Sequence, residues 1–310
     1  MKTQNILFRA DSSSTIGTGH IMRDLVLAEQ FSGDNIIFAT QDLPGNINHK
    51  IEEKKYTIET LASNDIEELS KIIEEHAIDM IVIDDYGIDY DFEKQLKESN
   101  TSLIIMVLDD TYERHYCAIL LNHNIYADSS RYKELVPKNC ELRCGSQYTL
   151  LREEFKTEKQ QKKNASHNGI NVFIAMGGAD HSNLNVKILA TLESLPNIQA
   201  NVVTTTANQH LPELQAYVKN RSNITLHINT HQIAKLMQES TLAIVTPSVT
   251  VNEIIAMDVP FIAIQTAKNQ RYMAQYLMDN NYHVLTRFDK KILHKNIKAL
   301  LKKIGVANDI

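Results

Sequence analysis

A turn with two glycines directly precedes a histidine near the start of the sequence. Residues 9–24 read RADSSSTIGTGHIMRD, in which Gly17 and Gly19 are two of only 10 glycines among 310 residues. Glycine lets a ligand approach the backbone, and imidazole is the side chain that most readily transfers protons near neutral pH. We therefore expect the turn to contact a ligand and His20 to act as a general base.

This turn follows a predicted strand, NILFRA, and opens a predicted helix near residues 21–31. The positive end of that helix dipole opposes a positive charge on His20, which should keep the imidazole available as a base. Met22 stands where a dinucleotide-binding turn has its third glycine, and no phosphate-loop lysine follows. A structural role stays open, in which His20 packs beside the turn and the serines solvate the loop.

Two strand-to-helix junctions in the second half predict an anion site. One is MGGAD, which contains Gly177 and Gly178, and the other is TPSV, which contains Ser248 and Val249. Backbone N–H groups at such junctions suit a diphosphate without a metal ion. Glu253 lies one turn into the following helix. Its carboxylate is placed either to accept hydrogen bonds from ribose hydroxyls or to form a capping box with the serine.

Other polar residues also follow predicted strands. In the segment AKNQR, Asn269 and Gln270 are candidates to orient a sugar hydroxyl or acetamido group, or else to cap a helix start. Two pairs of adjacent aspartates, at 84–85 and at 109–110, stand at the ends of two predicted strands in the first half of the sequence. The D-x-D at 89–91 resembles a metal-binding motif, but it lies at a helix entrance, where aspartate is an ordinary cap. We expect neither a metal ion nor a cofactor.

Composition narrows the class of protein. A length of 310 residues favours two domains of about 150 residues each. The net charge of −6 and the pI near 6.1 come without a basic block, so nucleic acid is not an expected partner. We expect no membrane span and a cytoplasmic protein. The three cysteines lack zinc-site spacing, and we expect them to be buried, reduced thiols.

Short apolar runs alternate with amphipathic segments, which is typical of parallel strands joined by helices. The sequence predicts an α/β fold with two Rossmann-like, doubly wound domains facing across a cleft, each with its ligand groups at the carboxyl ends of its strands. We expect an N-terminal domain over 1–155 that carries His20 and a C-terminal domain over 168–288 that carries the diphosphate site. The polar stretch 156–169 is expected to be a linker or surface loop, and 289–310 a helix packing back across the cleft.

From residue 6 to about residue 284, this sequence resembles the sequences of one protein family. The segments that carry the resemblance, in the same order, are FRADSSSTIGTGHIMRDLVLAEQF, DYGID, LLNHNIYA, RCGSQYTLLREEF, MGGAD, SVTVNE and KNQ. The family is that of the UDP-2,4-diacetamido-2,4,6-trideoxy-β-L-altropyranose hydrolases of pseudaminic acid biosynthesis. The resemblance implies a glycosyltransferase-B architecture, like that of the lipid-linked N-acetylglucosaminyltransferase of peptidoglycan synthesis. It also implies metal-independent release of UDP by inverting C–O cleavage.

The resemblance implies roles for individual residues as well. The family's catalytic histidine falls on His20, its nucleotide-binding glutamate on Glu253, its junction arginine on Arg152 and its second-domain amide on Asn269. The expected substrate contacts are Asp11, Gly17, Gly19, Arg23, Tyr86, Arg152, Asn269 and Gln270, and the expected UDP contacts are Gly177, Gly178, Ser248, Val249 and Glu253. Asp85 stands where the family usually carries histidine, which leaves the role of this position open.

These expectations describe a hydrolase in which His20 deprotonates a water molecule opposite UDP. A glycosyltransferase of the same architecture would use the same histidine on an acceptor hydroxyl, and a hydrolysing UDP-sugar 2-epimerase shares the fold with a poorer motif match. A nucleotide-sugar sensor that binds without turnover is an alternative outside the enzymes. The expected partner is a small-molecule nucleotide sugar. The oligomeric state stays open, with a monomer as the simplest case.

Overall fold

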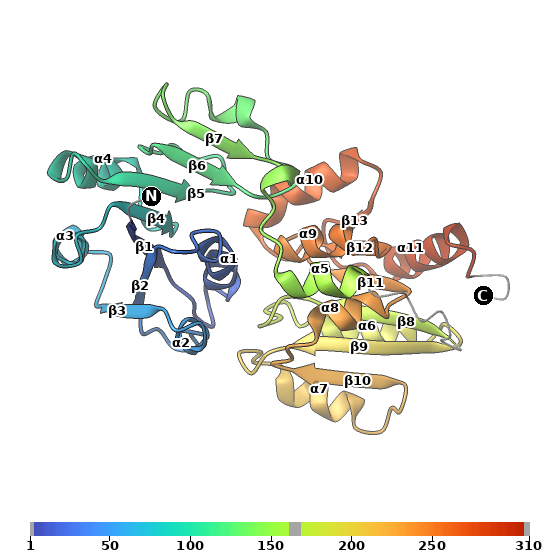
Figure 1. Ribbon diagram of the computed structural model, residues 1–310. Coiled ribbons are helices and arrows are strands. Elements are labelled where there is room, and N and C mark those ends of the chain that lie inside the picture. The colour runs from blue at the N-terminus through green and yellow to red at the C-terminus, as the bar shows by residue number, and fades with distance from the viewer. Residues whose placement is uncertain (1–2, 161–168, 307–310) are drawn as a thin grey trace. The chain divides into compact units, whose positions relative to one another are not determined.

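The computed structural model describes residues 3–160 and 169–306, which divide into two compact units. Unit 1 comprises residues 1–150 and unit 2 residues 151–310 (Figure 1). Within each unit, parallel strands alternate with helices along the chain. This arrangement confirms the prediction of two Rossmann-like domains.

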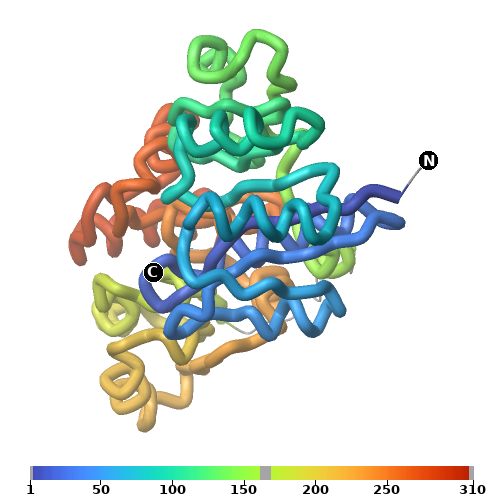
Figure 2. Tube along the Cα trace, turned by 90° about the vertical axis from the view of Figure 1, so that its left-hand side faces the viewer, coloured from blue at the N-terminus to red at the C-terminus, as the bar shows by residue number. Residues whose placement is uncertain are grey.

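Unit 1 contains a seven-stranded sheet in the order β3-β2-β1-β4-β5-β6-β7, in which each pair of neighbouring strands is parallel. Helix α1 covers one face, whereas α3 and α4 lie on the other (Figures 1 and 2). The strands are β1 Asn5–Ala10, β2 Asn35–Gln41, β3 Thr57–Leu61, β4 Met80–Asp84, β5 Ile104–Leu108, β6 Ile119–Asn122 and β7 Glu141–Cys144. The helices are α1 Gly19–Ala28, α2 His49–Glu53, α3 Ile66–Glu75 and α4 Tyr90–Ser99, with 3₁₀ turns η1 Ser129–Tyr132 and η2 Ser146–Tyr148.

Strand β1 alternates its side chains between the two faces of this sheet, as the strand period of two residues requires. Phe8 joins the apolar cluster beneath α1, where its ring stacks on Phe38 with centroids 5.0 Å apart. Arg9, one residue later, is fully buried and contacts Asn64, which precedes α3 on the other face. The first strand thus anchors both layers of the unit.

Unit 2 contains a six-stranded parallel sheet in the order β10-β9-β8-β11-β12-β13. Its strands are β8 Ile170–Ala175, β9 Ile198–Thr204, β10 Ile224–Ile228, β11 Leu242–Val245, β12 Phe261–Ile264 and β13 His283–Leu285. Its helices are α5 Glu153–Gln160, α6 Asn185–Leu192, α7 Leu211–Val218, α8 Ile233–Gln238, α9 Val249–Ala256, α10 Arg271–Asp279 and α11 Lys290–Lys303, with η3 Lys268–Gln270.

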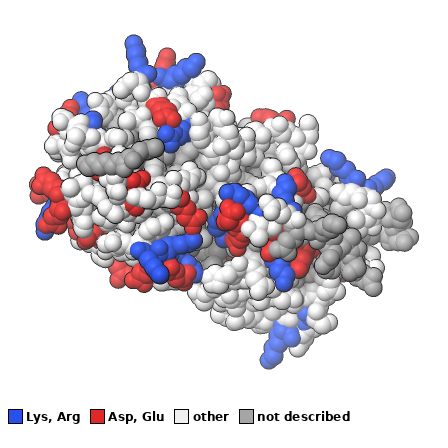
Figure 3. All heavy atoms as spheres, viewed as in Figure 1, with Lys and Arg blue, Asp and Glu red and all other residues white. Residues whose placement is uncertain are grey.

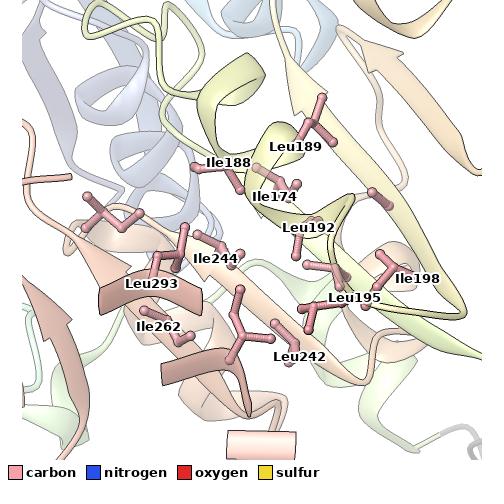
Figure 4. Close-up of a cluster of buried hydrophobic side chains, with 14 of the residues drawn as sticks. Ile174, Ile188, Leu189, Leu192, Leu195, Ile198, Leu242, Ile244, Ile262 and Leu293 are labelled. Atoms are coloured by element: carbon pink, nitrogen blue, oxygen red, sulfur yellow. The ribbon is translucent and has the colours of Figure 1, made fainter. Parts of the chain in front are cut away.

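The apolar core of unit 2 contains residues from the first and the last elements of that unit. Figure 4 shows Ile174 and Ile244 of the central strands with Ile188 of α6 and Leu293 of α11, all of them almost fully buried. Burial of this apolar area supplies the main driving force for folding of the unit. Helix α11 is therefore an integral part of unit 2.

Both sheets reverse their winding direction at an equivalent place. In unit 1 the switch lies between β1 and β4, and in unit 2 it lies between β8 and β11. Open parallel sheets bind ligands outside the carboxyl ends of the strands at such a switch point. The loops that follow these four strands are therefore the places where a functional site is expected.

Several sequence-based boundaries need correction. The unit boundary falls after residue 150, because α5 packs on α8 of unit 2 rather than closing unit 1. The first part of the expected linker, 156–160, is helical as the end of α5, while 161–168 lie outside the described residues. Helix α11 packs on α6, β12 and β13 of its own unit. The short elements α2, β7 and β13 were not predicted.

Charged side chains of both signs lie close together over the face that Figure 3 shows, in agreement with the modest net charge of −6. Among the described residues, no helix is both long and apolar enough to span a bilayer.

Candidate active site

His20 lies in the first turn of α1 and is held by the last residue of β4. Its Nδ1 atom lies 2.8 Å from Oδ1 of Asp84 and 3.0 Å from the backbone oxygen of the same residue. Both oxygens only accept hydrogen bonds when the carboxyl is ionised, and they lie closer to Nδ1 than the donor Nη2 of Arg23 does at 3.2 Å, so in the neutral ring Nδ1 carries the proton and donates it. The lone pair is then on Nε2, which makes this nitrogen the basic atom of the ring.

Asp84 is ionised by its surroundings. The carboxylate is only 1% exposed, and Arg23 binds both of its oxygens, with Nε at 2.6 Å from Oδ2 and Nη2 on Oδ1. Burial alone would raise the pKa of Asp84, but the charges of Arg23 and His20 outweigh burial and lower this pKa. The acceptor for the imidazole proton therefore stays charged.

A second carboxylate completes the network. Nη1 of Arg23 lies 3.1 Å from Oδ2 of Asp110, and the hydroxyl of Tyr86 donates to Oδ1 of the same carboxylate at 2.8 Å. The ring of Tyr86 stands edge-on to His20 with centroids 5.0 Å apart. Because His20 is 8% and Tyr86 55% exposed, the tyrosine presents an open surface beside a mostly buried base.

Arg23 was expected to contact substrate directly. The structure shows it 5% exposed, with its guanidinium bound to Asp84 and Asp110. An arginine engaged by two carboxylates has little capacity left for a ligand. The geometry instead assigns it to positioning Asp84, and through Asp84 the histidine.

The glycine turn before α1 is closed by its own backbone. The amide of Gly17 donates to the oxygen of Ser13 at 2.8 Å, and Oγ of Ser13 accepts hydrogen bonds from Thr15 and Ile16. Gly17 has φ of +90°, a conformation that glycine adopts readily. A Cβ atom added at Gly17 or Gly19 would meet no atom within 4 Å, so the backbone is open to a ligand at both positions.

Asp11 and Asp85 both form ion pairs with the buried guanidinium of Arg9. Asp11 accepts a hydrogen bond from Arg9 at 2.7 Å and another from the amide of Gln41, and it is 4% exposed. Asp85 pairs with Arg9 at 3.0 Å and accepts from the amide of Gly87. The expected substrate contact of Asp11 is therefore not favoured by the geometry. Asp85, whose role the sequence left open, has structural contacts in this chain.

In unit 2, the junction after β8 is a tight turn. Gly177 has φ of +77°, and Asp180 accepts hydrogen bonds from the amides of Leu184 and Asn185 at the start of α6. The carboxylate of Asp180 thus satisfies two amides at this helix start, although Leu184 occupies the N-cap position of α6. A Cβ atom on Gly178 would approach the Cγ2 atom of Thr205 to 2.9 Å, so close packing requires glycine there.

The junction after β11 leads into α9 through Ser248. The serine occupies the N-cap position, yet its side chain makes no cap hydrogen bond and its Oγ lies 3.1 Å from Oγ1 of Thr246. The alternative of a capping box with Glu253 is therefore not formed. Val249 is the first residue of α9, and this helix start retains the geometry that suits an anion.

Arg152 and Glu253 were selected separately from the sequence, and unit 2 brings them together. Nη2 of Arg152 donates to Oε1 of Glu253 at 2.9 Å, and the guanidinium lies over the ring of Phe155. Burial raises the pKa of Glu253, although the positive charge of Arg152 opposes that effect. The ion pair holds the carboxylate of Glu253, which lies in the middle of α9.

The two amide residues after β12 separate into different roles. Oε1 of Gln270 accepts hydrogen bonds from the amides of Thr266 and Ala267, at 2.8 and 3.2 Å. This side chain stabilises its own turn, which favours the cap alternative over a sugar contact. Asn269, in contrast, is exposed within η3 and stays a candidate contact.

Sequence reasoning assigned no role to Asp84 and Asp110, although it placed both at strand ends. Their proximity to each other could have been inferred from the sequence, because in a doubly wound sheet β4 lies between β1 and β5. The distance to His20 was not available, since 64 residues separate it from Asp84.

Comparison with solved structures defines the class of protein. The chain superposes on Acinetobacter baumannii MurG with a TM-score of 0.65 at 14% identity, covering 98% of this chain and 94% of that one. It superposes on Anabaena Alr3699/HepE in complex with UDP-glucose with a TM-score of 0.63 at 12% identity, covering 98% and 91%. The fold is thus that of the glycosyltransferase-B enzymes.

Comparison with curated proteins narrows this class to a family. The chain is 42% identical over 279 residues to the UDP-2,4-diacetamido-2,4,6-trideoxy-β-L-altropyranose hydrolase of Campylobacter jejuni, covering 90% of this chain and 98% of that protein. It is also 23% identical over 279 residues to the spore coat polysaccharide biosynthesis protein SpsG of Bacillus subtilis, covering 87% and 80%. Models of known protein families give no match. The chain belongs to the family of the UDP-2,4-diacetamido-2,4,6-trideoxy-β-L-altropyranose hydrolase.

Proposed function

We propose that this chain hydrolyses UDP-2,4-diacetamido-2,4,6-trideoxy-β-L-altropyranose to UDP and the free sugar, and that His20 is the base. The observation that supports this role most directly is the 2.8 Å hydrogen bond from Nδ1 of His20 to Asp84. It places the proton on one ring nitrogen and the lone pair on the other. Family membership supplies the substrate class.

The reaction is a single displacement. Nε2 of His20 accepts a proton from a water molecule while the water oxygen bonds to the anomeric carbon, and the bond from that carbon to the UDP oxygen breaks. The imidazolium that forms is stabilised by the ionised Asp84. Because UDP leaves as a stabilised anion, the step requires no general acid, and attack opposite UDP inverts the anomeric configuration.

We further propose that unit 2 binds the UDP moiety. The diphosphate contacts are the backbone amides at Gly177, Gly178 and the start of α9, and the ribose hydroxyls are held by Glu253. Arg152 supports this assignment because it holds the carboxylate of Glu253 in one orientation. Asn269 is proposed to bind an acetamido group of the sugar, and the ring of Tyr86 to contact its apolar face.

The test is nuclear magnetic resonance of the products formed from this UDP-sugar in ¹⁸O-labelled water. We expect the label only in the free sugar, an inverted anomer as the first product, and unlabelled UDP. Label in UDP would show P–O cleavage and contradict the proposed displacement, and absence of UDP release would remove the hydrolase assignment altogether. Full turnover after treatment with EDTA is the expected result for a metal-independent step.

We propose that the protein acts as a cytoplasmic monomer on this small-molecule substrate. Sedimentation of the purified chain at the mass of one copy is the expected result, and a stable dimer would contradict it.

A further inference from the structure

Two of the three cysteines of unit 1 lie in direct contact. Sγ of Cys117 is 3.7 Å from Sγ of Cys140, although the two residues are 23 positions apart in the sequence. Cys117 lies just before β6 and Cys140 just before β7. The parallel pairing of these strands holds them side by side, with the amide of Glu141 donating to the oxygen of Ala118 at 2.8 Å.

This geometry is close to that of a disulfide. The register of β6 and β7 pairs Ile119 with Glu141, so Cys140 falls opposite Ala118, one residue from Cys117. With strands about 4.8 Å apart and a rise of about 3.3 Å per residue, such a diagonal pair has Cα atoms about 6 Å apart, within the roughly 4.4 to 6.8 Å that disulfides span. Forming a bond of about 2.05 Å requires the two sulfurs to approach by rotation of their side chains, while the strands stay paired. The backbone on either side of the pair is already positioned for the bond.

The two thiols differ in their reactivity. Cys117 is 5% exposed, whereas Cys140 is half-buried. The hydrogen bond with Cys117 lowers the pKa of Cys140, and the nearby His115 acts in the same direction. Although burial opposes a charge on His115, Asp109 and Glu93 raise its pKa to about 9, so the imidazole is positively charged at neutral pH. These conditions favour a thiolate at Cys140 and a protonated thiol at Cys117.

Cys144 provides an internal comparison. It is the last residue of β7 and is also half-buried, but burial raises the pKa of its thiol to about 11. The two side chains are similarly exposed, but we expect a much smaller fraction of thiolate at Cys144 than at Cys140.

We propose that Cys117 and Cys140 form a reversible redox site that closes to a disulfide on exposure to a peroxide. The thiolate of Cys140 attacks one peroxide oxygen and the O–O bond breaks, which gives a sulfenic acid and a hydroxide that takes up a proton to become water. The thiol of Cys117 then attacks the sulfenic sulfur, the S–O bond breaks, and a second water leaves. Two thiols are oxidised and one peroxide is reduced to two waters. This inference is independent of the proposed hydrolysis.

The test treats the reduced full-length protein with hydrogen peroxide, blocks the remaining thiols with iodoacetamide, and maps the peptides without reduction. We expect one intramolecular link between Cys117 and Cys140, reversal by dithiothreitol, and alkylation of Cys144 alone. A link that includes Cys144, a disulfide between two chains, or three alkylated cysteines would overturn the proposal.

Single serine variants separate the roles of the two thiols. In Cys117→Ser, the sulfenic acid at Cys140 has no thiol to react with, so dimedone should label Cys140. In Cys140→Ser, Cys117 should stay a free thiol at the same peroxide dose. Cys144→Ser is the matched control and should form the link as the unmodified chain does. Far-ultraviolet circular dichroism of each variant confirms that it is folded, and dimedone labelling of Cys117 instead of Cys140 would reverse the assignment.

Discussion

The switch point of unit 1 and that of unit 2 occupy the same place in two sheets of similar topology, but different groups gather there. Between β1 and β4, ionised side chains dominate, with Asp84 and Arg23 buried beside His20. Between β8 and β11, glycine turns, hydroxyl groups and a helix start are present instead. A parallel sheet supplies a position, whereas the residues of the following loop decide the chemistry.

This difference divides the proposed reaction between the units. A fixed network of charges suits proton transfer, because it sets the orientation of the imidazole before substrate arrives. A backbone turn suits a diphosphate, because several N–H groups can converge on it without an added positive side chain. Variants in unit 1 should therefore change the chemical step, and variants in unit 2 should change nucleotide affinity.

The largest effect is expected for His20→Ala. Removing the base should lower kcat by about 10²- to 10⁴-fold, the usual contribution of general base catalysis. Binding of UDP, measured by isothermal titration calorimetry, should change little because the proposed UDP contacts all lie in unit 2. Normal turnover by this variant would show that the histidine has no role as the base.

A smaller loss is expected for Asp84→Asn, because the amide can donate to Nδ1 and favour the wrong tautomer of His20. We expect kcat to fall by about 10²-fold, together with a change in the pH profile of kcat. Asp110→Asn is the matched control, since Asp110 binds Arg23 and Tyr86 without contacting the histidine. Equal losses in the two variants, with equal unfolding midpoints, would mean that Asp84 acts only through stability.

An affinity effect is expected for Gly178→Ala in unit 2. The new Cβ atom would approach Cγ2 of Thr205 to 2.9 Å and displace the turn. We expect the Kd for UDP to rise about tenfold, or about 1.4 kcal/mol, with kcat at saturation little changed. Adding Thr205→Ser removes the clashing methyl group and should restore binding. A lower kcat with an unchanged Kd for UDP would contradict the assignment of nucleotide binding to unit 2.

A different kind of effect, on stability rather than on turnover or affinity, is expected for His115. Burial opposes the charge on His115, but Asp109 and Glu93 raise its pKa from 6.5 to about 9. Its ion pairs therefore stabilise unit 1 below pH 6.5, and about 3 kcal/mol is lost as the pH rises through 9. His115→Gln should remove this alkaline loss from the free energy of unfolding, measured with urea at several pH values.

His227 of unit 2 is the control of opposite sign. Burial lowers its pKa, so the unfolded state binds more protons and stability falls as the pH drops below 6.5. His227→Gln should reduce this acidic loss and leave the alkaline range unchanged. The same alkaline change in both variants would argue against the His115 ion pairs as its cause.

Much of the fold was predictable because it depends on local patterns. The apolar runs that form β1, β4, β8 and β11 lie where the sequence predicts strands, and the glycine turns follow β1 and β8 as expected. The short strands β7 and β13 lack such a signal. Their four and three residues are stabilised by pairing with a neighbouring strand, which a single segment does not encode.

Candidate residues were found by type and position, but their tasks depend on partners elsewhere in the chain. His20 was identified from its turn, and the carboxylate that orients it was not. Gln270 and Asp11 have suitable side chains for a sugar, yet their polar atoms are engaged within the fold. Family resemblance indicated the substrate class without revealing which of these groups are free to meet it.

The amino-acid sequence by itself determined the alternating α/β pattern, the glycine junctions and the family, because strand period, turn chemistry and motif order are written along one segment at a time. Only the tertiary structure decided that Asp84 and Arg23 position the histidine and that Asp85 forms an ion pair with Arg9. It also decided that Cys117 and Cys140 are in contact. These relations depend on atoms a few ångströms apart in space and tens of residues apart in the chain, so packing of the sheets had to bring them together.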